Sequence, residues 1–191
     1  LVGFILRPDF WGNLDNSFNL LLAFTEIGIM AVGMVYVIGN GDIDLSVGAV
    51  LALSGSTAAF LMKKADMAPI MAATFAFSVG TMAGVINGFL STKAKLPAFV
   101  ATLGMFYTAR GLGAWFSGGR QLNQFPPEFN LIGRKFYVVL DYWGIAPAPD
   151  SIFYALTRAV STQTMILAVL AIVAGIVLAK TAAGYMVMAT G

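Results

Sequence analysis

Residues 39–48 read GNGDIDLSVG, a polar turn that stands between two apolar segments. FNLLLAFTEIGIMAVGMVYVI (18–38) comes before it, and LSVGAVLALSGSTAAFLM (45–62) overlaps its end and continues beyond it. About 20 mostly apolar residues are enough for a helix to cross a bilayer. Because Asn40-Gly41 is a turn signal and the carboxylates of Asp42 and Asp44 follow at once, the pattern predicts two membrane helices joined by a sharp turn.

The composition extends this conclusion to the whole chain. Of its 191 residues, 59% are hydrophobic and only 10% are charged, whereas soluble domains have about 45–50% and about 25%. Lipid is therefore the predicted solvent. The net charge of +2 gives no indication of a nucleic acid partner. The sequence contains no cysteine and no histidine, which excludes thiolate or histidine metal ligands and the Ser-His-Asp and Cys-His catalytic arrangements within it.

Five segments are long and apolar enough to cross a bilayer, or come close to it. They are residues 18–38, 45–62, 68–90, 96–116 and 163–179. The sequence thus predicts an all-α, polytopic transmembrane helix bundle, in which residues 1–191 form a single, incomplete domain of a longer subunit. The stretch 117–162 is expected to be a long extramembrane segment.

Small residues recur at every fourth position along the segment 68–90, namely at Ala72, Ala76, Gly80, Gly84 and Gly88. Such spacing allows helix backbones to approach each other closely in lipid. We therefore expect Gly80, Gly84 and Gly88 to lie at a helix contact. The alternative is that glycine and alanine are simply common in membrane helices.

The two aspartates have a structural and a catalytic interpretation. Asp44 precedes an apolar run, where an N-cap carboxylate accepts hydrogen bonds from the N–H groups of Ser46 or Val47 and meets the positive end of the helix dipole. Asp42 has no helix start of its own. Gly-Asn-Gly-Asp at 39–42 also fits the Gly-x-Gly-Asp pattern of intramembrane aspartyl proteases, whose chemistry needs a second carboxylate across a cleft. Since no other aspartate lies inside a predicted span, this is a remote alternative.

Four longer stretches resemble a single family, the permease subunits of bacterial ABC sugar importers of the ribose/xylose/galactose type. The stretches are AVGMVYVIGNGDIDLSVGAVLALSG (31–55), NGFLSTKAKLPAFVATLGM (87–105), ARGLGAWFSGGR (109–120) and KTAAGYMVMATG (180–191). Their order and spacing are similar to those of the family. Asp44 fits the family pattern directly, whereas the pattern has glycine where Asn40 stands or a second glycine at Asp42.

The resemblance implies a transporter subunit and not an enzyme. It implies a homodimer of permease copies in the bacterial cytoplasmic (inner) membrane, an ATPase subunit that binds ATP and Mg, and a periplasmic solute-binding protein. The chain itself contains no Gly-x-x-x-x-Gly-Lys-Ser/Thr phosphate loop. The solute is expected to be small and polar, with a monosaccharide favoured. Related permeases carry nucleosides and branched-chain amino acids, so the solute class stays open. A structural or regulatory membrane subunit without substrate is the alternative.

The resemblance also implies an orientation, because it places the stretch after Lys180 in the cytoplasm. Alternation of the spans then puts 117–162 in the periplasm and the turn 39–48 toward the cytoplasm. The positive-inside rule agrees only in part, since Lys63 and Lys64 fall in a short periplasmic loop. The aromatic residues of 117–162 either contact the binding protein or rest at the membrane interface.

Two charged residues fall inside the predicted spans. Glu26 lies about 12 Å and Arg110 about 10 Å below the outer edge, at 1.5 Å per residue. An isolated charge at this depth is costly, so the two are expected to pair or to line one polar pathway. Alternatively, Arg110 extends outward to the interface and Glu26 is protonated. Together with Asp42, Asp44 and Asn87, they are the candidate residues of the solute pathway, or else structural polar residues.

Overall fold

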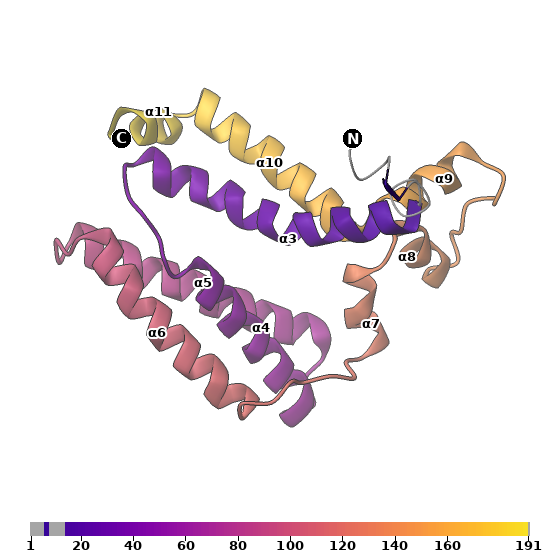
Figure 1. Cartoon of the computed structure of the whole chain (residues 1–191), viewed down its shortest axis with the longest axis horizontal. Helices are drawn as coiled ribbons and strands as arrows, with labels where there is room; N and C mark the ends of the chain where they lie inside the picture. The colour runs from indigo at the N-terminus through magenta and orange to yellow at the C-terminus, as the bar shows by residue number, and fades with distance from the viewer. Residues whose placement is uncertain (1–5, 8–13, 191) are drawn as a thin grey trace. The chain divides into compact units, whose positions relative to one another are not determined.

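The computed structural model describes residues 6–7 and 14–190, and every element named in them is helical (Figure 1). The helices are α3 (Leu14–Gly39), α4 (Val47–Lys64), α5 (Pro69–Thr92), α6 (Ala98–Ser117), α7 (Pro127–Asn130), the 3-10 turn η1 (Leu131–Gly133), α8 (Phe136–Tyr142), α9 (Ile152–Ala159), α10 (Thr162–Lys180) and α11 (Ala182–Thr190). Across these residues, β pairing is limited to one isolated antiparallel bridge between Lys135 and Ser161. The all-α fold class is confirmed.

Three helices among the described residues are long and apolar enough to cross a membrane: Phe18–Gly39, Pro69–Thr92 and Thr162–Lys180. The other two predicted spans coincide with α4 and α6, which are less apolar. α4 contains the hydroxyl residues Ser54, Ser56 and Thr57 and ends with two lysines. Because α4 packs against both α5 and α6, it does not need an apolar surface on every side.

The chain divides into two compact units. The first is formed by the described residues up to Val35 together with Asn130–Met186, and the second by Tyr36–Phe129 with the residues from Val187 onward. The predicted extramembrane segment 117–162 is therefore shared between the two units. It is also more ordered than a plain loop, because it contains α7, η1, α8 and α9.

In the second unit, α4 lies between α5 and α6, and small side chains line both contacts. Ala58 and Met62 of α4 are buried with Ala72 and Ala76 of α5. Toward α6, Ala49 and Leu53 of α4 form a second buried cluster with Ala109 of α6. A Cβ atom built on Gly113 of α6 would lie 3.5 Å from the Cα atom of Leu53. The backbones of α4 and α6 therefore approach each other closely at Gly113.

The glycine register of α5 is only partly at a helix contact. A Cβ atom on Gly80 would lie 3.0 Å from Ser54 Oγ of α4, but no heavy atom of the described residues lies within 4 Å of the corresponding position on Gly84 or Gly88. Within the described residues, the expected contact is therefore seen at Gly80, and for Gly84 and Gly88 it stays a prediction. At 3.6 residues per turn, a step of four residues rotates about 40° past the starting face. The buried face of α5 therefore continues through Ala83 and Asn87 instead.

In the first unit, α3 and α10 run parallel. The hydroxyl groups of Thr25 and Thr164 are 3.1 Å apart and share a hydrogen bond. One turn further along both helices, a Cβ atom on Gly28 would lie 2.7 Å from Leu167 Cδ2. The two contacts advance together along both helices, which defines the parallel direction. Five alternating spans require this relation between the first and the fifth.

Candidate functional site

The turn at the end of α3 is closed by backbone hydrogen bonds. The N–H of Asp42 donates to Val37 O (3.2 Å), and the N–H of Gly41 donates to Ile38 O (2.9 Å). Gly41 has a φ of 77°, a left-handed conformation that glycine adopts without steric cost. This pair of bonds is the Schellman motif, which ends a helix by satisfying its last carbonyl groups. The Asn40-Gly41 signal thus ends α3 as the sequence predicts.

Asp44 organises the start of α4 through two hydrogen bonds. Its Oδ1 atom accepts from the N–H and from the hydroxyl of Ser46, each at 2.7 Å. The bond from the Ser46 N–H is the one expected from the sequence. The N-cap residue of α4, however, is Ser46 and not Asp44, because α4 begins at Val47, two residues later than an Asp44 cap requires.

Side chains from α5 and α6 attach to this turn. Asn87 Nδ2 donates to Ser46 Oγ (3.0 Å), and the N–H of Leu45 donates to Thr102 Oγ1 (3.2 Å). Ser46, Asn87 and Thr102 are 1%, 7% and 3% exposed. Buried polar groups without partners are destabilising, so these bonds fix the turn against both helices.

The available protons determine which group donates in each hydrogen bond between Asp44, Ser46 and Asn87. The single hydroxyl proton of Ser46 goes to Asp44, so Ser46 Oγ can only accept from the Asn87 amide. Asn87 must then present its nitrogen to Ser46. Its Oδ1 atom is left buried, with no hydrogen-bond partner among the described residues. Asn87 thus retains one unused acceptor next to the turn.

A cavity of about 330 Å³ opens beside the turn. Gly84 and Gly88 line it, and the residues that line it with hydrogen-bonding side chains are Tyr36, Asn40, Asp42, Asp44, Asn87, Ser91, Thr92 and Thr102. The two glycines have no side chain to fill the space. Within the described residues, Gly84 and Gly88 therefore leave room for the cavity. The cavity brings together three of the five predicted pathway residues, Asp42, Asp44 and Asn87.

Oxygen acceptors are prominent in this cavity. When ionised, the carboxylates of Asp42 and Asp44 can accept hydrogen bonds but cannot donate them. The unused Oδ1 acceptor of Asn87 is close by. The arrangement suits a ligand rich in hydroxyl or N–H donors. No group of three or more aspartate, glutamate, histidine or cysteine residues that could hold a metal ion occurs in the part of the chain that the structure describes.

The opposite end of the second unit is held by Lys63. Its ammonium group donates to the backbone carbonyl of Gln124 and lies 5.9 Å from the centroid of the Phe125 ring. Lys63 also belongs to the last turn of α4, where a cation is favoured by the helix dipole. A local structural role thus accounts for one of the two lysines that conflict with the positive-inside rule.

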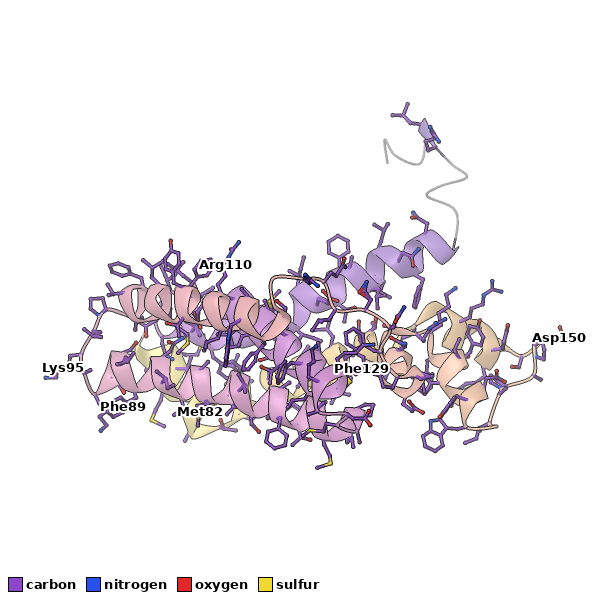
Figure 2. All side chains as sticks on the ribbon, turned by 90° about the horizontal axis from the view of Figure 1, so that it is seen from below. Met82, Phe89, Lys95, Arg110, Phe129 and Asp150 are labelled. Carbon is purple, nitrogen blue, oxygen red and sulfur yellow. The ribbon has the colours of Figure 1, made fainter. Side chains whose placement is uncertain are left out.

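The structure does not bring Glu26 and Arg110 together within one unit. Glu26 is an exposed residue of α3 in the first unit, and Arg110 belongs to α6 in the second. Arg110 points away from α5, and its guanidinium lies 5.8 Å from the Phe106 ring centroid (Figure 2). The proposed pair therefore stays a prediction.

Ser46 and Thr102 are the site residues that the sequence reasoning missed. Both carried a local signal. Ser46 stands immediately before the residue at which α4 begins, and Thr102 is a hydroxyl residue in the first two turns of α6, where its neighbours are apolar. A hydroxyl at such a position needs an acceptor or donor nearby when it is buried.

The chain matches one family along most of its length. The family described as "Branched-chain amino acid transport system / permease component" matches residues 16–191. The chain belongs to this permease family. With its long apolar helices, it is a multi-pass integral membrane protein. No solved structure matches this permease chain.

Curated relatives of this permease chain carry the names of sugar transporters. The ribose import permease protein RbsC of Escherichia coli (strain K12) is 35% identical over 144 residues, covering 72% of this chain and 44% of the relative. The galactofuranose transporter permease protein YtfT of the same organism is 34% identical over 140 residues, or 70% and 41%. RbsC of Bacillus subtilis (strain 168) is 35% identical over 136 residues, or 70% and 42%. The chain thus spans less than half the length of these relatives.

Proposed function

We propose that this chain is part of the membrane-spanning permease subunit of an ATP-driven importer that moves a small polar solute into the cytoplasm. Among small polar solutes, a monosaccharide is favoured. The match of residues 16–191 to the permease family carries the proposal. The cavity at the Asp42–Asp44 turn supports it, because hydrogen-bond acceptors gather there in a unit whose outer surface is apolar.

The choice of a monosaccharide rests on the relatives. The family description names branched-chain amino acids, whereas the relatives are named for ribose and galactofuranose. The hydroxyl groups of a sugar can donate to the carboxylates of Asp42 and Asp44. A branched-chain amino acid is a zwitterion, so its carboxylate would be repelled by these charges while its ammonium group would be attracted. The preference for a sugar therefore rests on the names of the relatives.

The proposed partners are an ATPase subunit that binds ATP and Mg, a periplasmic solute-binding protein, and a second permease copy that completes a homodimer in the lipid of the inner membrane. Lys95 lies in the turn between α5 and α6 (Figure 2), and we assign this turn, which also contains Lys93, to the cytoplasmic side. Asp42, Asn40 and Thr92 line one cavity, so the Asp42–Asp44 turn lies at the same end. Lysines near cytoplasmic ends agree with the positive-inside rule.

Co-purification with stimulated ATP hydrolysis tests this proposal. The complete subunit is expressed with the ATPase and the binding protein encoded beside it, and ATP hydrolysis by the isolated complex is measured in lipid nanodiscs. We expect the three proteins to purify together and hydrolysis to rise when the sugar-loaded binding protein is added. If the rate of ATP hydrolysis does not change when the loaded binding protein is added, the result would instead favour a structural or regulatory subunit.

A further inference from the structure

Helix α9 carries an uncovered apolar stripe that the transport function does not use. Ile152, Phe153 and Leu156, here called the α9 stripe, are 82%, 53% and 60% exposed. At 100° per residue, all three point within about 100° of each other around the helix axis. A stripe of this width is typical of a helix that places one side against an apolar phase.

The opposite side of α9 is already packed. The ring of Tyr154 lies 5.5 Å from the ring of Tyr137 in α8. Thr157 is buried and donates to Phe153 O at 3.0 Å. The helix is also capped locally, because Ser151 Oγ accepts from the N–H of Tyr154 at 3.1 Å. The α9 stripe is therefore exposed on a helix whose structure is supported from its other side.

Short connections hold α9 at the first residues of α10. Only Val160 and Ser161 separate the two helices. The N–H of Phe136 donates to Val160 O at 2.8 Å, and Lys135 forms a bridge with Ser161. The starts of α8 and α10 are thus joined, and α9 is attached at the same point (Figure 1).

The length of α10 fixes the level of this point in a membrane. α10 has 19 residues, which extend about 28 Å at 1.5 Å per residue. The hydrocarbon core of a bilayer is about 30 Å thick. α10 is therefore only just long enough to cross the hydrocarbon core, and Thr162 must lie at the edge of that core. Because α9 ends at Ala159, only three residues before Thr162, it lies at the membrane surface.

We propose that α9 is an interfacial helix, with the α9 stripe facing the acyl chains and Arg158 facing the lipid headgroups and water. Arg158 is exposed and, at 100° per residue, points about 170° away from the middle of the α9 stripe. Interfacial helices bury an apolar face about 5–10 Å into the boundary between headgroups and acyl chains. Tyr142 and Trp143, both more than half exposed, are residue types that favour this depth.

Lipid is the occupant favoured by continuity with α10. Met165, Ile166 and Val169, in the first two turns of α10, are exposed apolar residues of a helix that is long and apolar enough to span a membrane. The α9 stripe lies next to that surface along the chain. The same bilayer that covers the start of α10 can therefore cover the α9 stripe as well.

Site-directed spin labelling tests the proposal directly, because the sequence contains no cysteine. Single cysteines replace Phe153 and Leu156 in the stripe, and Asp150 and Arg158 outside it. Asp150 lies at the tip of the segment that precedes α9 (Figure 2). Each labelled subunit is reconstituted in liposomes. Collision rates of the label are then measured with oxygen, which concentrates in lipid, and with a water-soluble nickel chelate.

We expect labels at 153 and 156 to collide preferentially with oxygen, and labels at 150 and 158 with nickel. Nickel preference at 153 and 156 would show a water-facing stripe and overturn the proposal. Low collision rates with both reagents would also overturn it, because they indicate a covering protein segment or a second copy. If either stripe variant fails to fold, Ile152→Cys provides the third stripe position.

Discussion

Ser46 is the residue on which the polar turn depends. Its hydroxyl donates to Asp44 and accepts from Asn87, and its N–H also bonds to Asp44. The side chain is 1% exposed. A carboxylate between two apolar segments is thereby explained, since Asp44 stabilises the start of α4 through groups that would otherwise be buried without partners.

Replacing Asp44 should separate its structural role from a role of its charge. Asp44→Ala removes the acceptor of two hydrogen bonds, and we expect the subunit to lose roughly 1–3 kcal/mol of stability. Asp44→Asn keeps an oxygen acceptor and should lose less. Thermal unfolding in detergent measures both variants.

Asp42→Ala is the matched control, because Asp42 is exposed and lies in the same turn. If Asp44→Ala is as stable as Asp42→Ala, the hydrogen bonds of Asp44 are not stabilising. If Asp44→Asn remains stable but abolishes uptake, the negative charge itself acts in transport.

At the scale of elements, α4 is the helix around which the second unit is packed. It contacts α5 through Ala58 and Met62 and α6 through Ala49 and Leu53. Close contact is possible because small residues such as Gly113 and Ala109 face it. In lipid, association of helices depends on such packing and on hydrogen bonds between helices.

Gly113→Leu should disrupt the contact between α4 and α6. A Cβ atom at Gly113 lies at an ordinary contact distance of 3.5 Å from the Leu53 backbone, so Gly113→Ala should be tolerated, but the larger leucine collides with that backbone. We expect a clear loss of monodisperse protein by size-exclusion chromatography. Gly111→Leu is the control, because no described heavy atom lies within 4 Å of its Cβ position. Equal yields of the two leucine variants would contradict close packing at Gly113.

The sequence predicted those elements whose signals are local. The apolar lengths predicted five helices, and Asn40-Gly41 predicted the turn that ends α3. The contacts between helices were harder to predict from the sequence. The four-residue repeat suggested Gly84 and Gly88, but within the described residues helical rotation carries the buried face to Ala83 and Asn87. The bond between Thr25 and Thr164 joins residues that are 139 positions apart, so no local pattern indicates it.

At the scale of the whole molecule, the remaining prediction from the sequence concerns Glu26 and Arg110. They belong to different units, so a pair between them would also fix those units relative to each other. Glu26→Gln and Arg110→Gln should each impair stability or uptake, and the double variant should be less impaired than the sum of the two. A double-mutant cycle measures this coupling. Strict additivity would show that the two charges act separately.

Transport in a reconstituted system tests the central claim most directly. The complete subunit is placed in liposomes with its ATPase, ATP is enclosed on the cytoplasmic side, and the binding protein is added outside. Labelled ribose, galactose, xylose and leucine are compared in parallel. We predict accumulation of at least one sugar that requires both ATP and the binding protein, with no accumulation of leucine. Accumulation of leucine alone would contradict the monosaccharide assignment, and accumulation of no solute by an assembled, ATP-hydrolysing complex would contradict an import function for this subunit.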